Sequence, residues 1–179
     1  PHGRVVIEVP HIQDLIDNCA FDTIYHEHLS YWDGYSLTHA AWDAGLVIED
    51  DDWLDVHGGS RRYWLRHIKP GEHYHNDYTK MSRRALEDFG EEIWARRNEI
   101  NDTLALAYSI EKDQKMLGWG ASAKATVMLN YIYKNWLPDA IIDETPEKQG
   151  MLMPGVHIPI ISPPSSLADV DVLWLLSWK

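Results

Sequence analysis

A tyrosine, two histidines and a glutamate stand side by side at Tyr25, His26, Glu27 and His28. A histidine can accept a proton near neutral pH, and a neighbouring carboxylate can orient the imidazole and raise its basicity. Tyr25 could donate a hydrogen bond to an oxygen that gains negative charge during a reaction. The group follows an apolar run at residues 4–9, and α/β proteins bind ligands beyond the carboxyl ends of their strands. The types and spacing of these residues therefore indicate general-base chemistry.

Two other interpretations of this group stay open on spacing alone. On a strand, His26 and His28 would face the same side and could bind a metal together with Glu27. The helical HExxH spacing and CxxC pairs are both absent, so we predict no metal site in this chain. Alternatively, the four residues form a hydrogen-bonded structural cluster.

A second candidate site is a glycine loop. Gly118 and Gly120 follow a predicted strand at 114–118 and precede a predicted helix at 125–133, with Asp143 about one strand later. This order is typical of dinucleotide-binding units, but the third glycine is missing. Lys124 near a helix N-terminus favours phosphate in general. The loop is either a tight structural turn or a phosphate site formed by Gly118, Gly120, Ala121, Ser122 and Lys124, with Lys148, Arg61 and His157 as weaker candidates.

The first part of the chain is predicted to form a sheet with one helix. The run at 4–9 ends at Pro10 like a central strand, a helix is expected at 35–44, and strands at 46–48 and 62–67 are close enough to pair antiparallel. Apolar residues three or four apart then predict an amphipathic helix over 78–110, with a break near Asn101 and Asp102, where Asp102 would cap a second segment.

The last third has the pattern of a small parallel α/β domain. Strand, glycine loop, helix and strand alternate there, and the further strands are expected at 140–143, 160–161 and 173–176. The chain starts with Pro1 and stops three residues after an apolar run that resembles a buried strand. We therefore expect the 179 residues to be part of a longer protein.

Composition excludes several classes of function. A net charge of −12 argues against a nucleic-acid surface, and no apolar run is long enough to span a membrane. The single cysteine, Cys19, cannot form an internal disulfide, which suits a cytoplasmic protein.

Residues 21–31, FDTIYHEHLSY, closely resemble the signature of S-adenosyl-L-methionine-dependent sugar C-methyltransferases. These enzymes methylate a carbon of nucleotide-linked keto-deoxysugars. The resemblance runs in order along nearly the whole chain, although Arg61 stands where family members usually have an apolar residue. The further matching segments are HGGSRR at 57–62, GWGASAK at 118–124, NY at 130–131, KQG at 148–150, PGVHIPI at 154–160 and LLSW at 175–178.

The resemblance implies an α/β protein in three parts. Residues 1–69 would end a class I S-adenosyl-L-methionine methyltransferase sheet, 70–112 would be a helical linker, and 113–179 would form a Rossmann-like C-terminal domain. The S-adenosyl-L-methionine loops and an N-terminal zinc module would lie upstream, in the N-terminal portion of the same protein, so the chain alone is expected to be inactive.

The resemblance also implies roles for individual residues. His28 would be the base that deprotonates carbon beside the sugar ketone, with Tyr25 and Glu27 assisting. His26, Arg62, His157 and the glycine loop would bind the nucleotide-linked keto-deoxysugar. Two alternatives remain: an NAD-binding oxidoreductase fragment, in which Asp143 meets a ribose, and a nucleotide-sugar-binding module without catalysis.

Overall fold

A computed structural model describes residues 3–56, 58–108, 114–132 and 134–176. By its internal contacts the chain divides into two compact units. The N-terminal unit comprises residues 1–21 and 28–91, and the C-terminal unit comprises residues 22–27 and 92–179. Several predicted features fall partly outside the described residues: His57 in the turn before Ser60, the helix ends at 109–110 and 133, the domain boundary at 112–113, and Ser177 and Trp178 in the last motif.

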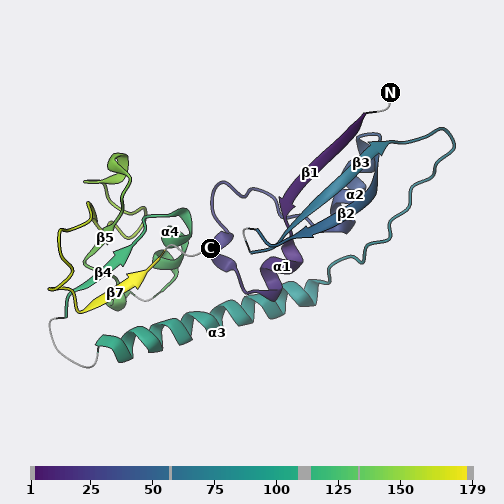
Figure 1. The fold of residues 1–179 in the computed structure, drawn as a ribbon. Helices are drawn as coiled ribbons and strands as arrows, with labels where there is room; N and C mark the ends of the chain where they lie inside the picture. The colour runs from purple at the N-terminus through teal and green to yellow at the C-terminus, as the bar shows by residue number, and fades with distance from the viewer. Residues whose placement is uncertain (1–2, 57, 109–113, 133, 177–179) are drawn as a thin grey trace. The chain divides into compact units, whose positions relative to one another are not determined.

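The N-terminal unit is a three-stranded sheet with a helix on one face (Figure 1). Its strands are β1 (Arg4–Pro10), β2 (Leu46–Leu54) and β3 (Ser60–His67), in the order β1-β3-β2. β3 is antiparallel to both neighbours, so β1 and β2 run in the same direction. Among the described residues β1 lies at the edge of this sheet, where Val5 and Val6 are exposed, and the central position expected for the strand at 4–9 stays a prediction.

Helix α2 (Gly34–Asp43) covers the inner face of this sheet. It begins at Asp33, whose carboxylate accepts a hydrogen bond from the Ser36 amide at 2.7 Å, while the Asp33 amide donates to Ser36 Oγ at 3.2 Å. This capping box satisfies amides that a helix start leaves unpaired. The buried core beneath α2 consists of Leu37, Ala41, Tyr63 and Leu65.

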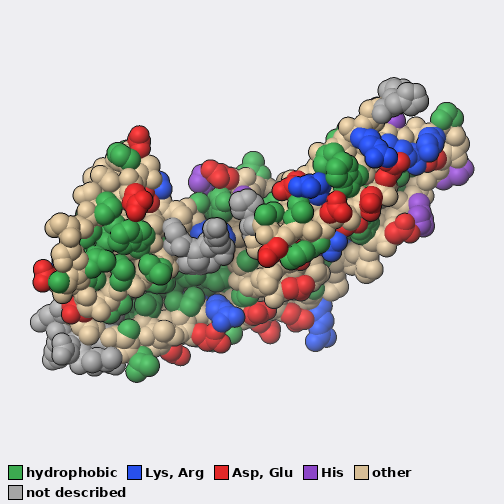
Figure 2. Space-filling view, viewed as in Figure 1, with side chains coloured by type: hydrophobic (Ala, Val, Ile, Leu, Met, Phe, Trp, Pro, Cys, Tyr) green, Lys and Arg blue, Asp and Glu red, His purple; other side chains and the backbone are tan. Residues whose placement is uncertain are grey.

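The outer face of the sheet is charged. Figure 2 shows basic and acidic side chains interleaved over these strands. Arg62 pairs with Glu8 at 2.8 Å, and Arg66 pairs with Glu49 at 2.9 Å. Odd and even residues of β3 therefore face different surroundings, as the two-residue period of a strand requires.

Helix α3 (Arg83–Tyr108) starts later than predicted and is continuous through Asn101 and Asp102. The predicted break is wrong, because the Asn101 side chain donates to the Arg97 carbonyl at 2.7 Å instead of interrupting the helix. Asp102 lies inside the helix and caps nothing.

The C-terminal unit is a parallel four-stranded sheet in the order β6-β5-β4-β7, which confirms the α/β class. Its strands are β4 (Met116–Trp119), β5 (Ala140–Ile142), β6 (Ile160–Ile161) and β7 (Val172–Leu175), and α4 (Ala123–Tyr131) follows β4. β5 is fully buried, whereas β7 is an edge strand that exposes Leu175. Short helical segments complete the chain: α1 (Ile12–Asp17), η1 (Phe21–Thr23), η2 (Lys134–Trp136) and η3 (Pro146–Lys148).

Gly59 lies where the turn before β3 meets α1. Its φ is +118°, and a Cβ there would lie 2.3 Å from Asp14 Cβ. Replacing Gly59 with alanine should lower the free energy of unfolding by about 3 kcal/mol, because backbone strain and a steric clash act together. Gly58 is the matched control: its φ is +84° but a Cβ would meet nothing within 4 Å, so Gly58→Ala should cost about 1 kcal/mol. Urea unfolding measures the free energy of unfolding of both variants. Equal losses of stability in the two variants would contradict the steric clash at Gly59.

Candidate functional site

The group at residues 25–28 lies on a loop between η1 and α2. Tyr25 and His28 are partly buried, whereas His26 and Glu27 are exposed. Because the segment is a loop, the strand geometry that would have turned His26 and His28 to the same side is not present. Among the residues that the structure describes, no three histidine, cysteine or acidic side chains are grouped as metal ligands would be.

The loop passes from one compact unit to the other between residues 27 and 28. Residues 22–27 group with the C-terminal unit, whereas His28 belongs to the N-terminal unit. The Tyr25 and His26 rings are 6.1 Å apart, and the His28 and Tyr31 rings are 6.3 Å apart. A motif that is continuous in sequence is therefore held by two separate sets of contacts.

Asp22 connects the start of the motif with the glycine loop within the C-terminal unit. Its side chain is only 6% exposed, and its Oδ2 atom has no hydrogen-bond partner among the described residues. Burial raises the pKa of this carboxyl group, and the nearby positive charge of Lys124 acts in the opposite direction. Lys124 is thus close enough to Asp22 to influence its ionisation.

The glycine loop joins β4 to α4 as predicted. Gly120 has a φ of +100°, and its amide donates to the Ile142 carbonyl at 2.8 Å. A Cβ on Gly118 would lie 2.5 Å from Ile141 Cδ1, so this glycine allows close packing on β5. Ser122 caps α4 by accepting a hydrogen bond from the Ala125 amide at 3.0 Å. The first turn of α4, which contains Lys124, is the part of the loop with the chemistry to bind an anion.

Asp143 closes the loop from beneath. Its Oδ2 accepts hydrogen bonds from the Ala121 amide at 2.7 Å and from Lys148 Nζ at 3.2 Å, and its Oδ1 accepts from the Thr145 amide at 2.9 Å. Burial alone would raise the pKa of Asp143, but the hydrogen bonds from Thr145, Ala121 and Lys148 outweigh it and lower the pKa to about 2. Ala121 and Lys148 are therefore committed to internal contacts.

The remaining predicted ligand residues lie elsewhere. Arg62 faces outward on the N-terminal sheet, where it pairs with Glu8. His157 is exposed in the C-terminal unit, has a φ of +58° and donates its amide to the Met153 carbonyl at 2.9 Å. The role of both residues in binding stays a prediction.

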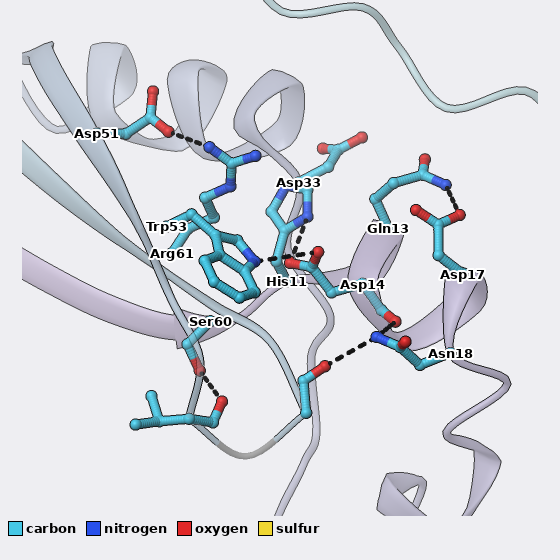
Figure 3. A network of polar contacts seen from close by, with 12 residues as sticks. His11, Gln13, Asp14, Asp17, Asn18, Asp33, Asp51, Trp53, Ser60 and Arg61 are labelled. Atoms are coloured by element: carbon cyan, nitrogen blue, oxygen red, sulfur yellow. Dashed lines mark hydrogen bonds and ion pairs between the residues drawn. The ribbon is translucent and has the colours of Figure 1, made fainter.

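A polar cluster in the N-terminal unit was missed by sequence reasoning. We call His11, Asp14, Asp51, Trp53 and Arg61 the strand-end cluster; Figure 3 shows their side chains facing one another. Arg61 Nη1 donates to Asp51 Oδ2 at 2.8 Å, and Trp53 Nε1 donates to Asp14 Oδ1 at 3.3 Å. His11 Nδ1 lies 3.5 Å from Asp14 Oδ2. Burial lowers the pKa of His11, although Asp14 acts to raise it.

Asp143 provides a test of the loop geometry. A folded-state pKa of about 2, below the ordinary 3.8, stabilises the protein above pH 3.8, and this stabilisation is lost as the pH falls toward 2. Asp143→Asn should therefore lower the free energy of unfolding by about 2 kcal/mol at pH 7 and by roughly half as much at pH 3. The exposed Asp169→Asn is the control and should change little at either pH. If Asp143→Asn lowered the free energy of unfolding by the same amount at both pH values, the assigned hydrogen bonds would be contradicted.

Comparison with known proteins gives concordant matches. The family described as C-methyltransferase C-terminal domain matches residues 55–179. C-methyltransferase NovU of Streptomyces niveus is 30% identical over 195 aligned residues, which cover 100% of this chain and 45% of NovU. The chain thus spans less than half the length of this curated relative, and residues 25–28 fall within that alignment. Because the family match covers most of the sequence, the chain belongs to the family of C-methyltransferase C-terminal domains.

Proposed function

We propose that this chain is the C-terminal portion of an S-adenosyl-L-methionine-dependent enzyme that methylates carbon beside the ketone of a nucleotide-linked deoxysugar. The observation that carries the proposal is the sequence Tyr25-His26-Glu27-His28 in a chain that belongs to a C-methyltransferase family. The name of its relative, C-methyltransferase NovU, supports methyl transfer to carbon. Transfer to carbon requires a carbanion, which proton removal beside a carbonyl supplies.

In the proposed reaction, His28 removes the proton from the carbon next to the ketone. The electron pair moves into an enolate, and Tyr25 donates a hydrogen bond to the enolate oxygen. Glu27 orients the His28 imidazole, and His26 contacts the substrate. Bound S-adenosyl-L-methionine, held by the N-terminal portion of the same protein, would supply the methyl group to this carbon as its sulfur–methyl bond breaks. The partial burial of Tyr25 and His28 supports these roles, because a partly desolvated donor or base interacts more strongly with developing charge.

The cofactor site is assigned to the N-terminal portion of the same protein, together with a zinc module. The order β1-β3-β2, with β3 antiparallel between two parallel strands, is consistent with the end of a methyltransferase sheet. NovU is more than twice as long as the aligned region, which supports the existence of such a portion. No helix among the described residues is long and apolar enough to cross a membrane. The single cysteine supports a cytoplasmic location.

The glycine loop is proposed to hold the diphosphate of the nucleotide-sugar. The first turn of α4 offers amides, and Lys124 adds a positive charge. The oxidoreductase alternative is less well supported, because Asp143 is buried and both of its oxygens already accept hydrogen bonds from within the C-terminal unit. Arg62 and His157 are weaker candidates, since Arg62 pairs with Glu8.

Replacement of His28 tests the catalytic role against the binding-module alternative. In the full-length protein, His28→Asn should reduce methylation by about 10²- to 10⁴-fold, because the base is lost while the side chain stays polar. Exchange of the substrate proton with deuterated water, measured without S-adenosyl-L-methionine, should fall in parallel. His75→Asn is the control, since this histidine is highly exposed and pairs with Asp77. Unchanged methylation by His28→Asn would reject the assigned base.

Replacement of Lys124 tests the diphosphate site in the 179-residue chain. Lys124→Met should weaken binding of dTDP about tenfold, the effect expected from losing one charge-assisted hydrogen bond. Lys115→Met is the matched control, because exposed Lys115 precedes β4 at the opposite end of that strand from the loop. Titration calorimetry measures the two affinities. Equal weakening by both variants, or by neither, would contradict the site, and stronger binding of NAD than of dTDP would favour the oxidoreductase.

A further inference from the structure

The C-terminal unit contains two buried aspartates whose surroundings differ. Asp143 accepts hydrogen bonds from two amides and from Lys148, and its pKa is lowered to about 2. Asp22 is 6% exposed, and its Oδ2 atom is buried without a hydrogen-bond partner among the described residues. Burial raises the pKa of Asp22 as a result. Asp143 is therefore held in its charged form, whereas Asp22 is the carboxyl group of this unit that can change its charge.

Two lysines near the glycine loop differ in a similar way. Lys148 Nζ donates to the Ala121 carbonyl at 2.9 Å and to Asp143 Oδ2 at 3.2 Å. Lys124, in the first turn of α4, is only partly buried. Among the described residues its ammonium group makes no hydrogen bond and no ion pair. The charge of Lys148 is therefore compensated by direct contact, and the charge of Lys124 stays available to an anion.

The charge of Lys124 acts on Asp22 without a direct ion pair. Burial has the largest effect on Asp22 and raises its pKa, and Lys124 is the charged side chain among the described residues that opposes burial. Hydrogen bonds from the backbone of Asp22 and Thr23 act in the same direction as Lys124. The exposed neighbours His26 and Glu27 do not act on Asp22. The ionised form of Asp22 thus depends on the one lysine that the glycine loop offers to a ligand.

A phosphate bound at this place would change the ionisation of Asp22. At the first turn of α4 it would lie close to Lys124 and compensate the positive charge that favours the Asp22 carboxylate. It would also add negative charge near a buried carboxylate, where charges are weakly screened. Both effects favour the protonated carboxyl group. Because Oδ2 has no partner among the described residues, protonation of this oxygen breaks no hydrogen bond there.

We propose that Asp22 is a built-in counter-charge for Lys124, and that a diphosphate bound at the first turn of α4 makes the Asp22 carboxylate take up a proton from the solvent. The inference rests on the proposed function, because the diphosphate is that of the nucleotide-sugar assigned to the glycine loop. Asp22 does not touch the ligand in this proposal and acts through Lys124. Because binding takes up a proton, the affinity for the diphosphate rises as the pH falls.

The uptake of a proton can be measured directly. dTDP-glucose is the suitable probe, because each of its phosphates is bonded on both sides and lacks the ionisation near pH 6 of a terminal phosphate. Titration calorimetry of the 179-residue chain at about pH 6, in buffers with different heats of ionisation, gives the number of protons taken up on binding. We expect uptake by the unmodified chain and clearly less uptake by Asp22→Asn. Equal proton uptake by the two proteins overturns the proposal.

The affinity of Asp22→Asn separates a charge role from a structural one. The melting temperature at pH 7 should be equal or higher, because burial disfavours the charged form in the folded protein and asparagine carries no charge. The variant should bind dTDP-glucose about fivefold more tightly at pH 7, because a like charge near the phosphates is removed. This difference should shrink as the pH falls toward about 5. Unchanged or weaker binding by Asp22→Asn overturns the proposal.

Asp169→Asn is the matched control, because it makes the same change in net charge. Asp169 is exposed and precedes β7, whose first residue pairs with the first residue of β4, at the opposite end of that strand from the glycine loop. It should change the affinity for dTDP-glucose less than twofold at either pH. Equal tightening by Asp22→Asn and Asp169→Asn would be an effect of net charge alone and would overturn the proposal.

Lys124→Met provides a measurement that needs no ligand. In carbon-detected NMR spectra of side-chain carboxyl groups, the Asp22 signal is identified by its absence in Asp22→Asn. Because Lys124 lowers the pKa of Asp22, this signal should titrate at higher pH in Lys124→Met than in the unmodified chain. Lys115→Met, at the far end of β4, should leave the titration unchanged. An Asp22 titration that does not move in Lys124→Met overturns the proposal.

The failure of this inference and that of the proposed function are distinguishable. Binding of dTDP-glucose that depends on Lys124 but on neither Asp22 nor pH overturns only the coupling. Binding that does not depend on Lys124, or no binding, overturns the diphosphate site and this inference with it. Methylation that does not need His28, together with proton uptake that needs Asp22, removes only the assigned base.

Discussion

The placement of β3 between two parallel strands is the constraint on which the N-terminal unit depends. Because β3 is antiparallel to both neighbours, the carboxyl ends of β1 and β2 meet its first residue, Ser60. The two-residue period of β3 then sends Arg61 and Tyr63 inward and Arg62 outward to Glu8. Shifting the pairing by one residue would exchange these faces, so one register decides which arginine belongs to the strand-end cluster.

A single carboxylate has a comparable role in the C-terminal unit. Asp143 follows β5 and accepts hydrogen bonds from the Ala121 amide, the Thr145 amide and Lys148. These donors keep it ionised despite its burial, and in return it fixes the loop between β4 and α4. An acidic residue after the second strand of such a unit is commonly associated with a ribose. Here its oxygens support the loop itself, which leaves the first turn of α4 and Lys124 facing any anion.

The motif at residues 25–28 is divided between the two compact units. Tyr25, His26 and Glu27 group with the unit that carries the glycine loop, and His28 groups with the unit that carries the strand-end cluster. Asp22 is buried near Lys124 at the first end of the motif, and beyond its other end the Ile12 amide donates to the Trp32 carbonyl. Under the proposed function, residues adjacent in sequence therefore depend on separate packing environments.

The local pattern of residues was enough to predict most elements, the parallel sheet and the family. An apolar run located β1, apolar periodicity located α2, and residues 21–31 carried the resemblance, because these signals depend only on neighbours in the chain. The tertiary structure decided what depends on distant partners. Which strands flank β3 depended on its antiparallel pairing with β1 and β2. The strand-end cluster joins residues about 40 positions apart, such as Asp14 and Trp53, and only strand register and burial bring them together.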